Sequence, residues 1–415
     1  MEVHRRSVGP LRVAAVQIPG LRSVASLFAL EAGQWSEPRG RAGVARLVAQ
    51  TLLRGTLARD ADAWAAALDD LGAVARLDVG SHAAVLSGQC LVADLRPYLR
   101  LVAEAVLHPA LDPREVDSVR AQTLAALDEA SRDTRAVADL VWRELAYPAP
   151  HPFRGRPLGE PEVVRAAAIE EVRAFHRRAI LGGRPVLVLA GGLGAPAMLD
   201  AAEEAFGEWP ASGGIQPGDV PTVTLATAER RSVVVPDKTQ CDVILGWLGL
   251  PRTDPRFTAA RVTNMVFAAD TFASRAGKIV RDQLGLAYYF HSTIAATRGQ
   301  GPWVVRMGVN PRNVERAIDT TFVELRRVLA GEVGGDDLDL ARDKLVGERQ
   351  VALESPGGIA GMVLEAELFD LGPDHLERYP RELRAVTTEQ VVEVARAFLS
   401  ADRYALAIAG PPPAA

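Results

Sequence analysis

The sequence is poor in cysteine and has no long apolar run. Cys90 and Cys241 are its only cysteines and form no C-x-x-C pair, so we expect two buried thiols rather than a disulfide. No apolar stretch approaches the ~18 residues that a membrane-spanning helix needs. The N-terminal segment also lacks the apolar core of a signal peptide. These absences predict a soluble, cytoplasmic protein with no membrane partner.

Neither sign of charge dominates the chain. It contains 47 Lys and Arg against 52 Asp and Glu, a net charge of -5, and the two signs are interspersed. Nucleic-acid surfaces need clustered cations, so no nucleic-acid partner is predicted. The seven histidines include no H-x-x-x-H pair, the helical spacing that lets two imidazoles bind one ion. We therefore predict no metal site in this chain.

The chain contains an internal repeat. Residues 165–191 align with residues 384–410 at a constant offset of 219 without gaps, and 9 of the 27 pairs are identical. Each copy has the pattern of an amphipathic helix, a turn and an apolar strand. Since 415 residues exceed one ordinary core, we predict two homologous domains. The Pro- and Gly-rich stretch at residues 210–221 would link a domain at 1–209 to one at 222–415.

Periodicity predicts the same order of elements in both halves. Further strands are predicted at residues 11–18, 24–31, 73–79, 83–92, 231–235, 243–248, 287–297 and 301–309. Further helices are predicted at residues 43–53, 61–70, 95–107, 113–132, 135–145, 257–267, 274–284, 313–329, 335–353 and 359–371. Strands grouped with long helices indicate an α+β protein. Each half would be an α/β sandwich whose mixed, mostly antiparallel sheet has helices on one face.

One of these helices has the frame of a metal-binding helix. Gly43–Thr56 reads GVARLVAQTLLRGT and is similar to G-x-A-H-F-L-E-H-x-L-F-K-G-T, the zinc helix of the pitrilysin/insulinase (inverzincin) family of metallopeptidases. Arg46 stands at the first histidine, Ala49 at the glutamate and Gln50 at the second histidine. Arginine remains cationic and repels a dication, and alanine cannot activate a water molecule.

The resemblance extends downstream. The segment HPFRGRPLG at residues 151–159 resembles the family's H-P-[YF]-G-x-P-x-x-G turn. The family's third ligand, a glutamate about 75 residues after the zinc helix, would fall at Ala125 or Ala126, while Asp128 and Glu129 are out of frame. The resemblance therefore implies that three ligands and the base are all missing.

A second motif keeps its polar residues. Residues 274–293 read SRAGKIVRDQLGLAYYFHST, similar to the family's S-S-R-L-x-x-x-[LV]-R-E-x-x-G-L-A-Y-x-[VF]-x-S. This resemblance makes Arg281 and Tyr288 the candidate catalytic pair. An arginine fork can bind a substrate carbonyl or carboxylate, and a tyrosine hydroxyl can donate to an oxyanion. The alternative is a surface ion pair between Arg281 and Asp282, with Tyr288 an ordinary strand residue.

A strand in the first half resembles the family's substrate strand. Residues 71–79 read LGAVARLDV, and the resemblance assigns Ala73, Val74 and Ala75 to pairing with an extended peptide by β-augmentation. An ordinary paired strand is the alternative.

Together these motifs resemble the non-zinc-binding subunits of bacterial two-subunit peptidases and of mitochondrial processing peptidase. The resemblance implies half of a clamshell, inactive alone, whose homologous H-x-x-E-H partner holds the zinc. The heterodimer would cleave peptides such as leader or precursor peptides. Two alternatives remain open, namely a structural, non-enzymatic core-type subunit of a larger complex and a homodimeric peptide-binding protein.

Overall fold

The computed structural model describes residues 2–210 and 220–412, which divide into two compact units. Unit 1 draws on residues 1–127, 156–218 and 351–376, and unit 2 draws on residues 128–155, 219–350 and 377–415. Each unit therefore includes a segment from the opposite half of the chain. Of the predicted linker at 210–221, residues 211–219 lie outside the described residues.

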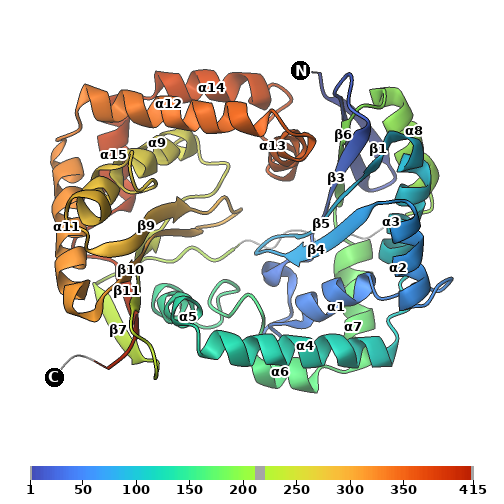
Figure 1. Ribbon diagram of the computed structural model, residues 1–415, viewed down its shortest axis with the longest axis horizontal. Coiled ribbons are helices and arrows are strands. Elements are labelled where there is room, and N and C mark those ends of the chain that lie inside the picture. The colour runs from blue at the N-terminus through green and yellow to red at the C-terminus, as the bar shows by residue number, and fades with distance from the viewer. Residues whose placement is uncertain (1, 211–219, 413–415) are drawn as a thin grey trace. The chain divides into compact units, whose positions relative to one another are not determined.

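Unit 1 contains a six-stranded sheet in the order β1-β2-β6-β3-β5-β4 (Figure 1). Its strands are β1 His4–Val8, β2 Leu11–Gln17, β3 Ser23–Leu30, β4 Val74–Val79, β5 Ala84–Leu91 and β6 Val186–Gly191. Among the described strands of this sheet, β2 and β6 pair in parallel, and the remaining neighbours are antiparallel. The strand β4 is an edge strand, because β5 is its one neighbour in the described sheet.

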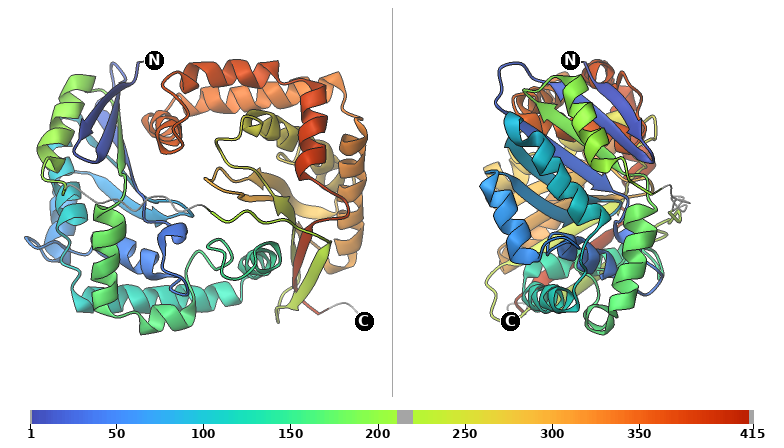
Figure 2. Two further views of the ribbon diagram at one scale, coloured as in Figure 1. Left: turned by 180° about the vertical axis from the view of Figure 1, so that it is seen from behind. Right: turned by 90° about the vertical axis from the view of Figure 1, so that its right-hand side faces the viewer.

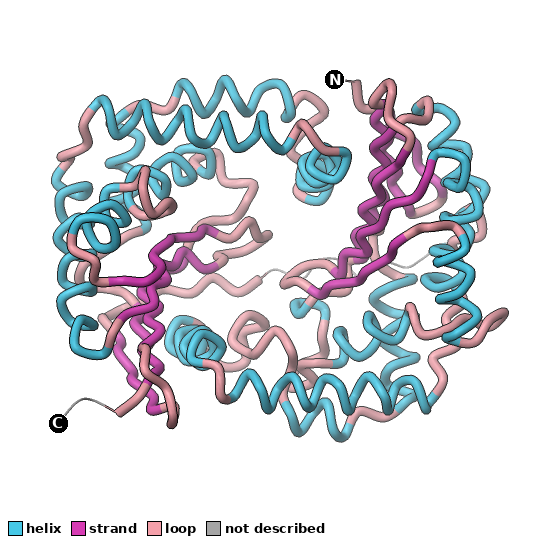
Figure 3. Tube along the Cα trace, in the orientation of Figure 1, coloured by secondary structure: helices cyan, strands magenta, loops and turns pink. Residues whose placement is uncertain are grey.

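Unit 2 contains a five-stranded sheet in the order β7-β11-β8-β10-β9. Its strands are β7 Glu229–Val234, β8 Cys241–Leu248, β9 Ala287–Ile294, β10 Pro302–Val309 and β11 Ala405–Gly410. The pair β7 and β11 is parallel and the rest are antiparallel. Figure 3 shows the strands of both sheets in magenta. Apart from β1, the two sheets match strand for strand, with β4 equivalent to β9. The predicted α+β fold of two homologous sandwiches is confirmed.

Most helices were predicted within a few residues. Those of the first half are α1 Val44–Leu52, α2 Ala61–Asp70, α3 Leu95–Leu107, α4 Pro113–Ser131, α5 Thr134–Ala146, α6 Pro161–Ala166, α7 Ile169–Phe175, the π-helical η3 His176–Leu181 and α8 Ala195–Phe206. Those of the second half are α9 Phe257–Phe267, α10 Arg275–Gly277, the π-helical η4 Lys278–Gln283, α11 Val314–Ala330, α12 Gly335–Ala352, α13 Pro356–Leu368, α14 His375–Ala385 and α15 Thr388–Phe398. Short 3-10 turns are η1 Gln34–Ser36, η2 Val92–Asp94 and η5 Pro311–Asn313. Among the described residues, no helix is long and apolar enough to cross a membrane.

Helices cover both faces of the unit 1 sheet, so the prediction of helices on one face only is wrong. On one face lie α3 and α8 (Figure 2). They enclose the main core, which includes Phe28 and Leu187. On the other face α13 packs against β3 and β6, burying Ile359 and Val363. Successive strand residues point to opposite faces, so strands buried on both faces carry long apolar runs. The covering helix α13 comes from the second half of the chain.

The unit 2 sheet has a reciprocal arrangement. Helices α9, α11 and α15 lie over the face that carries Val243 and Leu245. The opposite face is covered by α5, which comes from the first half of the chain and packs against β8 and β11. Gly246 permits this approach, because a Cβ there would lie 2.9 Å from Trp142 Nε1.

Candidate active site

The helix that resembles a zinc helix begins where two glycines meet. Gly43, with φ of 112°, is the N-cap of α1, and Gly159, with φ of 94°, ends the downstream turn. A Cβ on Gly159 would lie 2.9 Å from Gly43 N, and one on Gly43 would lie 2.7 Å from Val164 Cγ2. Only glycine combines this backbone conformation with this packing. The frame of the motif thus has a structural function independent of metal.

A half-buried carboxylate caps this helix. Glu37 Oε1 accepts hydrogen bonds from the backbone N–H groups of Gly43 at 2.7 Å and Ala45 at 2.9 Å. The helix itself offers no partner to these first N–H groups. Burial raises the pKa of Glu37 to about 7, although both hydrogen bonds act to lower it. Glu37 was not predicted from the sequence, since a cap this far before the helix has no local signature.

The first zinc-motif positions carry side chains unsuited to zinc. Arg46 is half-buried, and its buried Nε has no hydrogen-bond partner in the described structure. Burial lowers the pKa of its guanidinium, partly offset by the charge of Asp78 on β4. Gln50 Nε2 donates to Leu77 O at 2.6 Å, which fixes α1 against β4. Ala49 is fully buried in the core.

The third ligand position is also apolar. Ala125 is exposed and Ala126 is half-buried on α4. Ala126 lies one helical turn after Gln122, whose Oε1 accepts a hydrogen bond from Arg54 just beyond α1 at 3.1 Å, so Ala126 lies on the side of α4 nearer to α1. Throughout the described ranges, no group of three or more His, Cys, Asp or Glu side chains could hold a metal ion. The residues present do not fit zinc.

The predicted substrate strand lies at a sheet edge. Val74 and Ala75 begin β4, opposite Gln89 and Gly88 of β5. The side chain of Val74 is 54% exposed, whereas Ala73 is buried just before the strand. An unpaired edge presents backbone N–H and C=O groups that an added strand can use.

The second motif lies in unit 2, on a helix, a turn and a strand. Arg281 belongs to the π-helical segment η4, and π-helical turns are frequent at functional sites. Gly285, with φ of 57°, turns the chain into β9. Arg281 has no ion pair with Asp282 or with another residue in the described part of the chain, so the alternative of a surface ion pair is absent.

Tyr288 is the extra residue of a β-bulge. Val309 of β10 pairs with Ala287 and the preceding Gly308 pairs with Tyr289, so Tyr288 has no opposite residue. Its side chain is 76% exposed. Bulges re-aim side chains and are enriched at sheet edges and beside active sites.

The adjacent tyrosine has a structural environment instead. The Tyr289 hydroxyl donates to the buried Asp242, which also accepts from Thr134 Oγ1. Arg135 stacks over the Tyr289 ring at 4.6 Å. Two consecutive tyrosines therefore differ, one tied into a buried network and one free at the surface.

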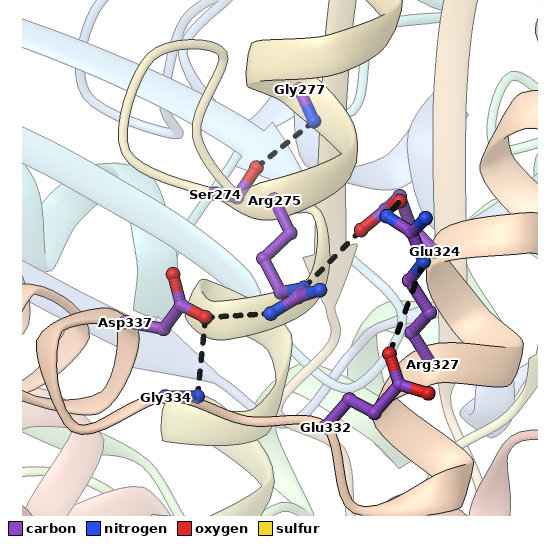
Figure 4. Close-up of polar contacts among 8 residues, drawn as sticks. All are labelled: Ser274, Arg275, Gly277, Glu324, Arg327, Glu332, Gly334 and Asp337. Carbon is purple, nitrogen blue, oxygen red and sulfur yellow. Dashed lines mark hydrogen bonds and ion pairs between the residues drawn. The ribbon is translucent and has the colours of Figure 1, made fainter.

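An ion cluster around the buried Glu324 anchors the helix that carries Arg281. Arg275 Nε lies 3.2 Å from Glu324 Oε2 of α11, and Arg275 Nη1 lies 2.7 Å from Asp337 Oδ2 of α12 (Figure 4). Glu324 is 2% exposed, and Arg327 also pairs with it at 2.7 Å. Paired buried charges of this kind hold elements in one geometry, because separation leaves an uncompensated charge. The start of the motif helix is fixed accordingly.

The two sandwiches, the helix that resembles a zinc helix, the half-buried Arg281 and the exposed Tyr288 define a protein built on a zinc-peptidase framework. Residues 12–148 match the family described as Insulinase (Peptidase family M16), and residues 167–345 match the Peptidase M16 inactive domain. The chain belongs to peptidase family M16, as its motifs predicted.

Curated relatives agree with this assignment, and solved structures have the same fold. An uncharacterized zinc protease of Streptomyces coelicolor is 25% identical over 412 residues, covering 97% of this chain and 88% of the relative. One from Mycobacterium tuberculosis is 26% identical over 409 residues, covering 97% and 92%. A peptidase M16 inactive domain structure from Pseudomonas fluorescens superposes with a TM-score of 0.91 at 24% identity, covering 99% of this chain and 98% of the other. A protease from Helicobacter pylori gives a TM-score of 0.90 at 15% identity, covering 99% and 100%.

Proposed function

We propose that this chain is the non-zinc-binding subunit of a heterodimeric zinc endopeptidase. Its partner is a homologous chain that has an intact H-x-x-E-H motif and holds the metal. One contrast carries the proposal. The metal positions are occupied by cationic, apolar and amide side chains, whereas Tyr288 remains exposed on a bulge after a fixed helix. A scaffold without chemistry has no physical need for a tyrosine presented in this way.

Arg281 and Tyr288 act on the substrate in trans. The guanidinium of Arg281 donates to a substrate carbonyl or carboxylate and orients the peptide. The Tyr288 hydroxyl donates to the oxyanion that develops at the scissile carbonyl, a contribution of about 3 kcal/mol for one donor. Zinc bound in the partner supplies the activation of water.

The substrate is an extended peptide, such as a leader or precursor peptide. The free edge of β4 at Val74 and Ala75 supports this choice, because an extended strand can add there through backbone hydrogen bonds. Ala73 stands at the entry to that edge. Both cysteines are buried free thiols, which fits a reducing compartment, and we place the complex in the cytoplasm.

The test is a substitution in the reconstituted heterodimer. Tyr288→Phe should lower kcat for peptide cleavage by about 100-fold, the effect of removing one oxyanion donor. Tyr404→Phe is the matched control, because this tyrosine packs against Phe322 with ring centroids 4.8 Å apart and should leave kcat unchanged. Unchanged kcat in Tyr288→Phe would remove that residue from the mechanism and favour a structural subunit. Peptide binding without cleavage in any mixture would favour a homodimeric binding protein.

A further inference from the structure

An exposed aromatic ring lies beside Arg281. The Phe272 side chain is 65% exposed, and the guanidinium carbon of Arg281 lies 5.2 Å from its ring centroid. A guanidinium over an aromatic face is attracted by the ring electrons. A single exposed apolar side chain is common, so the exposure of Phe272 does not by itself indicate a binding site. The structure of the surrounding loop is the second observation.

The backbone on both sides of Phe272 is fixed. Asp270 Oδ1 accepts hydrogen bonds from the N–H groups of Phe272 and Ala273, both at 2.8 Å. Asp270 Oδ2 lies 3.2 Å from Lys344 Nζ of α12. Thr271 Oγ1 donates to Phe290 O of β9 at 2.8 Å, which ties the loop to the strand that carries Tyr288. The loop is held rigid while its largest apolar side chain is left in solvent.

A rigid loop with an exposed aromatic ring is preorganised to bind a ligand, whereas the exposed ring does not stabilise the free protein. The loop is already ordered before binding. A ligand that covers the ring therefore buries apolar surface without the entropic cost of ordering the loop. The stacked guanidinium keeps its edge N–H groups available, and Arg281 has no acidic partner within the described residues. The site thus combines an unfilled apolar surface with an unneutralised cation.

We propose that Phe272 is a third substrate-binding residue of the Arg281 and Tyr288 site, and this rests on the peptide substrate of the proposed function. The ligand is an extended peptide with an apolar side chain two residues from a carboxylate. Side chains at i and i+2 lie on the same side of an extended peptide, about 6.5 Å apart, close to the 5.2 Å between ring and guanidinium. The apolar side chain packs on Phe272 and the carboxylate accepts from Arg281.

Binding of labelled peptides to the full chain tests this directly by fluorescence polarisation. Four peptides share a Gly/Ser background and carry Phe-Gly-Glu, Ala-Gly-Glu, Phe-Gly-Gln or Ala-Gly-Gln. We expect the wild-type chain to bind Phe-Gly-Glu about tenfold more tightly than Ala-Gly-Glu, the effect of partly burying one aromatic side chain. Phe272→Ala should abolish that preference and retain the preference for Glu over Gln, whereas Arg281→Ala should lose the Glu preference.

Matched variants keep the outcome clear. Phe272→Leu should retain part of the preference, and Val351→Ala, which removes another exposed side chain (71% exposed), should leave it intact. An undiminished Phe preference in Phe272→Ala, or no binding of any peptide, overturns the inference.

The cleavage assay with the partner tests the proposed function separately from this inference. Phe272-dependent binding without cleavage contradicts only the proposed function, and Tyr288-dependent cleavage with unchanged specificity in Phe272→Ala contradicts only this inference.

Discussion

Gly159 lies against Gly43 so closely that a Cβ on Gly159 would come within 2.9 Å of the Gly43 nitrogen. Both residues belong to motifs by which the family is recognised. Their contact explains how the frame of such a helix can persist when the predicted ligand positions hold other residues, because packing at the start of α1 requires these glycines whether or not a metal is bound.

Gly159→Ala should therefore destabilise the protein by about 2–4 kcal/mol, since it adds a steric clash to a left-handed backbone conformation. Gly40→Ala is the matched control. Gly40 also has positive φ, at 72°, but a Cβ added there would meet no atom within 4 Å, so about 1 kcal/mol of backbone strain is expected. Urea unfolding midpoints measure both. Equal losses would show that the contact with Gly43 contributes nothing.

Glu37 should make stability depend on pH. Its pKa is about 7 in the folded protein against 4.5 for an ordinary glutamate, so the folded state binds this proton more tightly. Its contribution is fully present below pH 4.5 and is lost as pH rises toward 7, by up to about 3 kcal/mol.

Glu37→Gln keeps an oxygen acceptor for both N–H groups and removes the titration. The melting temperature of this variant relative to wild type should therefore be higher at pH 8 than at pH 5. Glu160→Gln is the control, because Glu160 is the N-cap residue of α6 but makes no side-chain capping bond. If the difference between wild type and Glu37→Gln is the same at both pH values, Glu37 is not the titrating group.

Restoring the motif on α1 alone should not restore a zinc site. The variant Arg46→His/Ala49→Glu/Gln50→His has two of the three protein ligands of a zinc site, so its zinc affinity should be at least about 100-fold below that of a quadruple variant with Ala126→Glu. The matched control places the fourth change at Ala125 instead, and we expect that glutamate to bind zinc poorly because it lies on the exposed side of α4.

Zinc content after dialysis, measured by atomic absorption, distinguishes these variants. Stoichiometric zinc in the triple variant would mean that Asp128 or Glu129 supplies the third ligand. That result would contradict the view that the site has been lost in full.

Local patterns in the sequence predicted most of the fold. The bounds of α2, α3 and α9 agree with the predicted helices, because each has a clear apolar stripe or an adjacent cap such as Asp60 on α2. The repeat at offset 219 predicted the equivalence of β6 and β11, which occupy matching positions in the two sheets. The edge strand β1 and the helices α6, α8 and α14 were missed. Short charged strands and a helix interrupted by Pro380 lack the periodicity on which prediction depends.

Long-range relationships could not be predicted in the same way. Nothing local marks α5 and α13 as covers for the sheet built by the opposite half of the chain, since an amphipathic helix does not specify its partner. The same holds for the site. The motif identified Arg281 and Tyr288, but the bulge at Tyr288 depends on pairing with Gly308 and Val309. Phe272 became a candidate only through its distance from Arg281.

The division of labour between two subunits is tested most directly by comparing three preparations for peptide cleavage and zinc content: this chain alone, a homologous H-x-x-E-H chain alone, and the equimolar mixture. We predict no cleavage and no bound zinc for this chain alone, and cleavage in the mixture that far exceeds that of the partner alone. Full activity from this chain by itself, with one zinc per molecule, would contradict the proposal.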